Sequence, residues 1–141
     1  MAMELGANAF ISTGEHENSV QAVEAALGGL PDVVLECTGA PGVFAEAISQ
    51  VRPRGTIVEL GFCAVPDSFV PAAALGKEVT IQFSMMYNLK DYQVVADVLD
   101  AGHVDPRIMI TEIVGLDQLP ATFEALRSPN EQCKVLVDPW A

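Results

Sequence analysis

The sequence predicts an α/β fold in which a mainly parallel sheet is flanked by helices. Short apolar runs rich in β-branched residues alternate with helical patterns of about ten residues, which is the arrangement that produces parallel strands. Half of the 141 residues are hydrophobic and 18% are charged, so the chain carries enough apolar material for one domain with its own core.

The first elements are short. Residues 1–7 look like the last turn of a helix, and residues 9–13 form a short β-prone run. A helix is predicted over residues 20–27, where Asn18 and Gln21 form a cap pair ahead of an apolar face.

The central strands carry the clearest pattern. Residues 32–37 are almost continuously apolar, which predicts a strand covered on both faces with Cys37 in the core. A helix is expected to begin at Pro41, and the next strand covers residues 56–60. The buried stripe of that helix is predicted to consist of Phe44, Ile48 and Val51.

The second half of the chain is less regular. Strands are predicted over residues 77–83, 108–114 and 134–137, and helices over residues 92–101 and 117–126. The apolar positions expected to face inward on the two helices are Val94, Val95, Val98, Leu99, Leu119, Phe123 and Leu126.

Charge and cysteine content limit the function classes. The formal net charge is −12, which disfavours nucleic acid and anionic membrane surfaces as partners. The three cysteines are an odd number without C-x-x-C spacing, and no signal-peptide pattern opens the chain, so we expect free thiols and a cytoplasmic location. Cys63 is the thiol that we expect to be exposed.

Five blocks carry a family resemblance, and they follow one another in the right order and spacing. They include Asp-Val-Val-Leu-Glu-Cys-Thr-Gly-Ala (residues 32–40), Arg-Pro-Arg-Gly-Thr-Ile-Val-Glu-Leu-Gly (residues 52–61) and Lys-Glu-Val-Thr-Ile-Gln-Phe-Ser (residues 77–84). Gly-His-Val-Asp-Pro (residues 102–106) and the ending over residues 119–139 complete the set. Together they resemble the C-terminal part of zinc-type medium-chain alcohol and polyol dehydrogenases.

The resemblance implies a partial Rossmann-like fold. The first three blocks correspond to the fourth, fifth and sixth strands of that fold, and residues 107–141 resemble the return segment of the catalytic domain. Residues 1–141 are therefore expected to be a truncated dinucleotide-binding domain that lacks the first two strands. No G-x-G-x-x-G turn occurs in the sequence.

The resemblance also implies a reaction and a cofactor site. The parent reaction would be hydride transfer between an alcohol or polyol and NAD(P), with zinc polarising the oxygen. The implied cofactor-binding positions are Thr38 and Gly39 on the adenosine side, Leu60, Gly61, Phe62, Ser84 and Met85 on the nicotinamide side, and Lys134 near the pyrophosphate. A structural interpretation competes with this one, in which the glycines form tight turns and the lysine is solvated.

No catalytic residue and no metal site are assigned. His16 and His103 are far apart in sequence, and no ligand pair has the short spacing of known zinc sites, so the zinc site is expected to be absent. The chain is therefore expected to be inactive by itself.

Two other functions stay open. The first is a non-catalytic module that self-associates or completes another chain, with residues 9–13 paired beside residues 32–37 or a partner strand in that place. The resemblance adds residues 79–83 as a second contact of a homo-oligomer joined through its sheet edges. The second is a zinc-independent quinone or enoyl reductase relative, which the Glu-Cys-Thr-Gly block at residues 36–39 disfavours.

Overall fold

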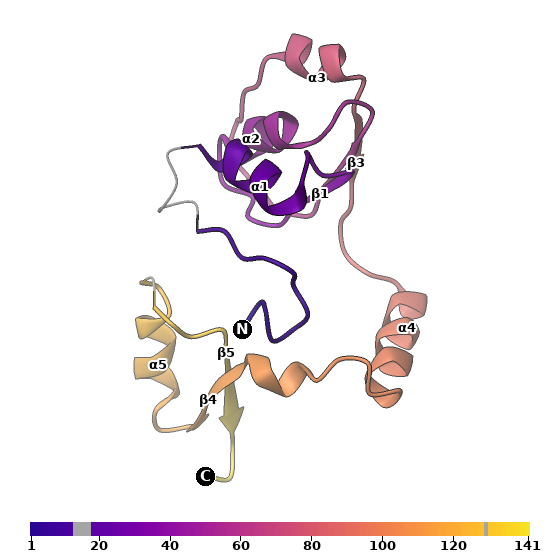
Figure 1. The fold of residues 1–141 in the computed structure, drawn as a ribbon. Helices are drawn as coiled ribbons and strands as arrows, with labels where there is room; N and C mark the ends of the chain where they lie inside the picture. Colours follow the sequence, from indigo (N-terminus) through magenta and orange to yellow (C-terminus); the bar gives the residue numbers. More distant parts are fainter. Residues whose placement is uncertain (13–17, 129) are drawn as a thin grey trace. The chain divides into compact units, whose positions relative to one another are not determined.

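The computed structural model describes residues 1–12, 18–128 and 130–141. The chain divides into two compact units. The three-stranded unit comprises residues 9–87, and the two-stranded unit comprises residues 1–8 with residues 88–141 (Figure 1).

A parallel sheet forms the centre of the three-stranded unit. Its strands are β1 (Val33–Glu36), β2 (Thr56–Glu59) and β3 (Thr80–Phe83), in the order β1-β2-β3. The strands pair without offset, so Glu36 lies opposite Glu59, and Glu59 lies opposite Phe83. All three carboxyl ends are therefore level at one edge of the sheet, which is where open α/β sheets place their ligands.

Three helices accompany this sheet: α1 (Ser19–Leu27), α2 (Val43–Gln50) and α3 (Pro71–Lys77). Helix α2 packs on β1 and β2, and both α1 and α3 contact α2. The buried core consists of Ala47, Ile48, Val51 and Ile57. The predicted stripe is confirmed, since Ile48 and Val51 are buried and the partly buried Phe44 packs against them.

The cap predicted for the first helix is also confirmed. The side chain of Asn18 accepts a hydrogen bond of 3.1 Å from the backbone N–H of Gln21. At the other end, Gly28 adopts a left-handed conformation with φ of 75° and closes the helix.

The two-stranded unit has a separate sheet. Helix α4 (Leu89–Asp100) is followed by the 3₁₀ turn η2 (Pro106–Met109), β4 (Ile110–Gly115), α5 (Leu119–Ala125) and β5 (Lys134–Asp138). Strand β5 pairs with β4 in parallel, as expected for strands joined through a helix. No helix in the described part of the chain is long and apolar enough to cross a membrane.

The prediction of a strand over residues 9–13 is wrong for residues 9–12, which form no strand, and Thr13 lies outside the described residues. β-prone residues form a strand only where a neighbouring strand accepts their hydrogen bonds. The predicted pairing with β1 is therefore not observed, and the outer edge of β1 carries no strand among the described residues.

Several predicted boundaries differ from the observed ones. The strand predicted from Lys77 begins only at Thr80, because residues 71–77 form helix α3. The helix predicted from Pro41 begins at Val43, after Gly42 with φ of 88°. The helix predicted from Tyr92 begins three residues earlier, because Asn88 caps it.

Burial differs from expectation in both units. On β1, Val33 and Leu35 are 52% and 61% exposed, although this strand was expected to be covered on both faces. Cys37 is exposed rather than in the core, while Cys63 is only partly exposed.

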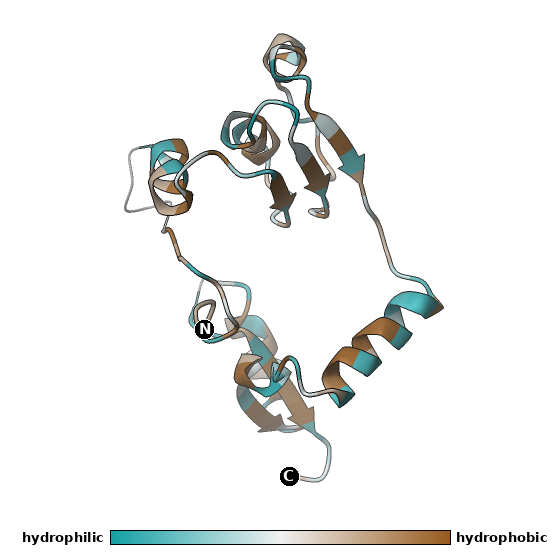
Figure 2. Ribbon diagram, turned by 45° about the vertical axis from the view of Figure 1, so that its right-hand side comes forward, coloured by the Kyte–Doolittle hydropathy of each residue, from teal (hydrophilic) through white to brown (hydrophobic). Residues whose placement is uncertain are grey.

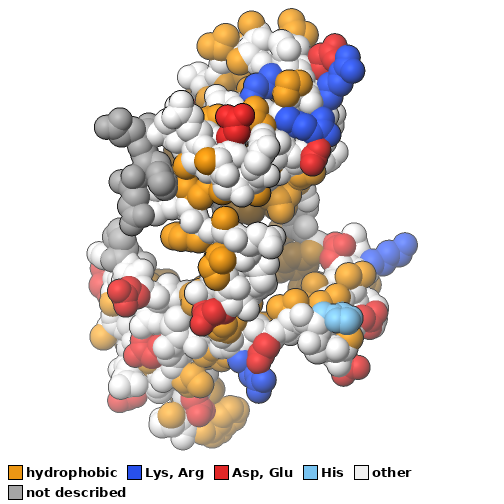
Figure 3. All heavy atoms as spheres, in the orientation of Figure 1, with side chains coloured by type: hydrophobic (Ala, Val, Ile, Leu, Met, Phe, Trp, Pro, Cys, Tyr) orange, Lys and Arg blue, Asp and Glu red, His pale blue; other side chains and the backbone are white. Residues whose placement is uncertain are grey.

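The two helices of the two-stranded unit also leave much of their apolar faces exposed. Figure 2 shows a hydrophobic stripe along α4, and Figure 3 shows hydrophobic side chains at the surface of both units. The exposed members of the predicted inward faces are Val94, Val95, Leu99, Phe123 and Leu126. These faces are not covered by the described residues of their own unit.

Candidate functional site

A pocket of about 530 Å³ opens at the carboxyl ends of β2 and β3. Five of the eight positions implied as cofactor-binding line it: Leu60, Gly61, Phe62, Ser84 and Met85. The structure adds Glu59, Cys63, Phe83 and Met86, which were not assigned from the sequence. The fold therefore brings together the whole group that the resemblance assigned to the nicotinamide side.

The pocket presents apolar side chains to solvent. Phe62 is 77% exposed, and Phe83 and Met85 are 69% and 74% exposed. Met86 follows with φ of 65°, a conformation that costs free energy for a residue other than glycine and is concentrated at functional turns. Exposed aromatic and thioether groups around a concave surface suit a flat, partly apolar ligand.

Glu36 organises the two loops beside this pocket. Its Oε1 accepts hydrogen bonds from the backbone N–H groups of Thr38 and Gly39, at 2.6 and 3.0 Å. Its backbone oxygen accepts from the N–H groups of Leu60 and Gly61, at 2.8 and 2.9 Å. One residue at the end of β1 thus binds both the loop that follows β1 and the loop that follows β2.

These loops meet at two glycines. A Cβ atom built on Gly39, whose φ is 66°, would lie 2.5 Å from the backbone nitrogen of Phe62. A Cβ atom built on Gly61 would collide with Oε2 of Glu36 and with the backbone nitrogen of Gly39. Both glycines are therefore required by close approach of backbone to backbone, which matches the structural interpretation of these residues.

Glu59 lies next to Glu36 on the neighbouring strand. Burial, followed by the hydrogen bond and the negative charge of Glu36, raises the pKa of Glu59 to about 7, and the charge of Asp67 adds to this. Burial acts to raise the pKa of Glu36 as well, but hydrogen bonds from Gly39 and Thr38 hold that pKa below its ordinary value. The two carboxyl groups therefore differ in their affinity for a proton.

The carboxyl pair was missed at the sequence level, although a signal for it exists. The two strands read Val-Val-Leu-Glu and Thr-Ile-Val-Glu, each with its glutamate at the last position. Parallel strands that pair without offset bring such terminal residues side by side on one face of the sheet.

The other three implied positions do not line this pocket. The N–H groups of Thr38 and Gly39 are bound to Glu36. Lys134 begins β5 in the two-stranded unit and is exposed. The structure thus groups the nicotinamide-side positions within the three-stranded unit.

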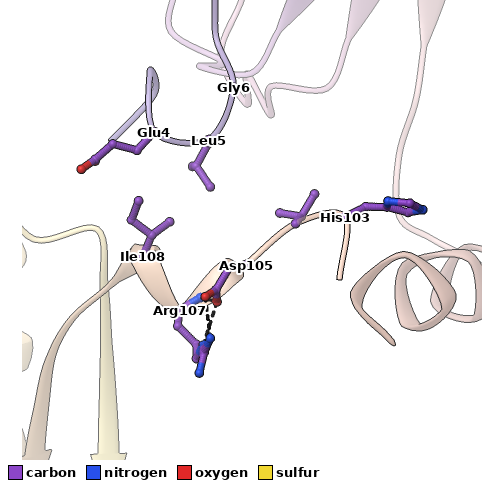
Figure 4. Close-up of a pocket in the computed structure, with 8 residues that line it drawn as sticks. Glu4, Leu5, Gly6, His103, Asp105, Arg107 and Ile108 are labelled. Carbon is purple, nitrogen blue, oxygen red and sulfur yellow. Dashed lines mark hydrogen bonds and ion pairs between the residues drawn. The ribbon is translucent and has the colours of Figure 1, made fainter. Parts of the chain in front are cut away.

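A second hollow, of about 760 Å³, lies within the two-stranded unit (Figure 4). Its charged groups are paired with each other, because Arg107 donates to both oxygens of Asp105 at 2.8 and 2.6 Å. The side-chain hydrogen bond from Arg107 lowers the pKa of Asp105 to about 2. In Figure 4 His103 lies apart from this pair, so the polar groups do not converge on a ligand.

The described residues include no group of three or more His, Cys, Asp or Glu side chains that could hold a metal ion. Zinc centres in proteins commonly have three or four such ligands.

Comparison with known proteins identifies relatives that are named as reductases and dehydrogenases. The chain is 27% identical to a D-xylulose reductase of Scheffersomyces stipitis over 98% of its own length and 40% of the relative's. The structure of 2R,3R-butanediol dehydrogenase from Bacillus subtilis matches with a TM-score of 0.85 and 27% identity, over 98% of this chain and 40% of that one.

A further match is a structure described as a short chain alcohol dehydrogenase from Escherichia coli CFT073, solved with NADH. It has a TM-score of 0.82 and 26% identity, and covers 96% of this chain and 40% of that one. The chain thus spans about 40% of the length of these relatives. The family model described as zinc-binding dehydrogenase matches residues 1–101, and the chain therefore belongs to the zinc-binding dehydrogenase family.

Proposed function

We propose that this chain supplies the nicotinamide side of the cofactor cleft in an NAD(P)-dependent alcohol or polyol dehydrogenase. The observation that carries the proposal is the pocket at the carboxyl ends of β2 and β3, which collects Leu60, Gly61, Phe62, Ser84 and Met85. The E. coli relative solved with NADH, and the relatives named D-xylulose reductase and 2R,3R-butanediol dehydrogenase, support the same assignment.

In this proposal the side chains of the pocket bind and orient a nicotinamide ring. Phe62 and Met85 offer exposed apolar surface to one flat ligand, and their contact with it excludes water. The exposed hydroxyl of Ser84, at the end of β3, can donate to or accept from a polar substituent of the ring. The bound nicotinamide would supply the hydride chemistry.

The proposal assigns cofactor contact to the chain and assigns it no catalytic group. Zinc enzymes of this kind polarise the substrate oxygen with the metal, and the described residues do not fit such a centre. The N–H groups of Thr38 and Gly39, which could otherwise bind a phosphate, already bind Glu36. We therefore expect weak cofactor binding and no turnover from the chain alone.

Titration of the purified chain with NADH, followed by nicotinamide fluorescence, tests the proposal. We expect saturable binding with a Kd on the order of 0.1–1 mM, because only part of a dinucleotide site is present. Phe62→Ala and Met85→Glu are expected to raise the Kd about tenfold. Both positions are exposed, so neither change threatens the core.

Leu75→Ala is the matched control, because Leu75 is 77% exposed on α3 and does not line the pocket. It is expected to bind NADH as the parent chain does. The absence of saturable binding at several times the expected Kd, with a folded chain, would contradict the proposal. If Leu75→Ala weakened NADH binding as much as the pocket variants do, the choice of pocket would be contradicted.

A second candidate function is a self-associating module whose partner is another copy of this chain. The observation that favours it is the exposed apolar surface of β1 at Val33 and Leu35, next to an edge that carries no strand among the described residues. Association through the sheet edges would cover this surface. A chain that stays monomeric at all concentrations in sedimentation velocity would contradict this candidate.

A further inference from the structure

Two carboxyl groups lie side by side where β1 and β2 end. Glu36 and Glu59 are paired positions on adjacent parallel strands, which stand about 4.8 Å apart, so their side chains leave the sheet on the same face. Glu36 is only 4% exposed. Water therefore does little to screen one carboxylate from the other.

The hydrogen bonds of the pair are complete only if one proton is present. The carboxylate of Glu36 accepts from the N–H groups of Thr38 and Gly39. Oε2 of Glu59 is buried and has no hydrogen-bond partner among the described residues. A proton on Glu59 makes that carboxyl a donor, and the adjacent carboxylate of Glu36 is an acceptor within its reach.

The same pair holds the loops of the proposed cofactor pocket. The backbone oxygen of Glu36 accepts from Leu60 and Gly61, and Gly61 packs against the Oε2 atom of Glu36. Glu59 itself lines the pocket, next to Leu60. A change in the charge of the pair therefore acts directly on the backbone that forms one wall of the pocket.

We propose that Glu36 and Glu59 share a single proton, and that this proton positions the loop of residues 60–63 for nicotinamide binding. Both glutamates are positioning residues in this proposal, which rests on the proposed function for its effect on the cofactor. When the proton is lost, two negative charges face each other, the loop moves, and the affinity for the cofactor falls.

Among the described residues, no positive charge is found to act on Glu59 and compensate for this loss. Besides Glu36, the charged group that acts on it is Asp67, which is also acidic. On the helices packed nearby, Glu46 of α2 accepts from Ser19 and Gln50, and Lys77 of α3 donates to the backbone at the end of α2. Strand β3 carries no charged residue. A pKa of about 7 for Glu59 is consistent with this environment.

Two independent measurements test the proposal. Carboxyl NMR of the chain with ¹³C-labelled glutamate is expected to show one glutamate that titrates near pH 7, and this signal disappears in Glu59→Gln. The Kd for NADH, measured between pH 6 and pH 8.5, is expected to rise at least about fivefold with pH in the parent chain. In Glu59→Gln a neutral amide stands in place of the protonated carboxyl group. The Kd of this variant for NADH is therefore expected to vary little between pH 6 and pH 8.5.

Glu24→Gln is the matched control, because Glu24 is exposed on α1, outside the pocket, and should leave both results unchanged. The carboxyl titration does not depend on the cofactor. If NADH fails to bind at any pH while one glutamate titrates near pH 7, the proposed function fails and the shared proton stands. If every glutamate titrates below about pH 5.5, or if Glu59→Gln keeps the pH dependence of the Kd, the proposal is overturned.

Discussion

At the scale of single residues, the site depends on two glycines, Gly39 and Gly61, whose neighbours leave no space for a side chain. Gly61 touches both the carboxylate of Glu36 and the backbone of Gly39, and Gly39 touches the backbone of Phe62. A methyl group at either glycine displaces backbone of the facing loop, and at Gly61 it also displaces the carboxylate of Glu36. Such displacement separates the two loops that Glu36 joins.

Gly61→Ala is therefore expected to lower the free energy of unfolding by about 1–3 kcal/mol. The control is Gly76→Ala, since a Cβ at Gly76 meets nothing within 4 Å and alanine favours a helix. The control is expected to be neutral or slightly stabilising. Urea unfolding of both variants checks this, and an equal loss in the two would contradict the close packing described for Gly61.

The pH dependence of stability follows from Glu59. Its pKa is about 7 in the folded chain, against an ordinary value of 4.5, so the folded state binds the proton more tightly than the unfolded state does. The free energy of unfolding therefore falls as the pH rises from about 4.5 to about 7. Glu36 acts in the opposite direction and below its ordinary value of 4.5, outside this window.

We expect the parent chain to lose about 1–3 kcal/mol relative to Glu59→Gln between pH 4.5 and pH 8. Urea unfolding at several pH values measures the difference. If the free energy of unfolding changed with pH in the same way in both chains, the raised pKa of Glu59 would be contradicted.

At the scale of elements, Lys77 joins two helices. Its Nζ donates to the backbone oxygens of Ile48, Ser49 and Val51, at 2.9, 2.7 and 2.7 Å. These carbonyls lie at the carboxyl end of α2, where helical carbonyls lack partners and the helix dipole is negative. Burial lowers the pKa of Lys77, and its three hydrogen bonds satisfy the ammonium group completely.

Lys77→Met is expected to cost about 1–3 kcal/mol, because it leaves three carbonyls without their charged donor. Lys90→Met, on the exposed face of α4, is the control and should change stability by less than about 0.5 kcal/mol. Thermal and urea unfolding measure both. A loss no greater than that of the control would show that the end of α2 does not depend on Lys77.

The elements also show what sequence patterns can predict. The strands ending at Glu36 and Glu59 were found because β-branched runs bounded by glycine and proline are a local signal. Helix α3 was missed because its seven residues are too few to show a helical period. The strand predicted over residues 9–13 depended on a neighbouring strand, and no local pattern contains that information.

The site was predictable in part, because some of its residues follow strands that have a local sequence signal. The nicotinamide-side residues could be assigned because they follow two recognised strands directly, and they do line one pocket. The bonds of Glu36 and the raised pKa of Glu59 depend on pairing without offset between strands. Register of this kind is a tertiary property that composition and periodicity do not report.

At the scale of the whole molecule, the chain has more apolar surface than its two units cover. It spans about 40% of the length of the relatives it matches, and it exposes Val33 and Leu35 on β1 and Phe83 on β3. Water-exposed apolar surface next to an open strand edge favours association.

We therefore expect the chain to form a concentration-dependent homo-oligomer. Leu35→Lys places a charge on the exposed face of β1 and is expected to weaken the association at least about tenfold. Leu75→Lys, on exposed surface of α3, is the control and should associate as the parent does. Sedimentation velocity measures the association of both variants. If Leu35→Lys and Leu75→Lys changed it equally, β1 would be excluded as the contact.

The central claim is that the pocket at the ends of β2 and β3 binds a nicotinamide ring. Amide NMR of the ¹⁵N-labelled chain, with NADH and with ADP-ribose in parallel, tests it most directly because the two ligands differ in that ring. We expect NADH, and not ADP-ribose, to shift the amide signals of Leu60, Gly61, Phe62, Ser84 and Met85. Identical shifts with both ligands, or shifts confined to residues outside the pocket, would contradict the claim.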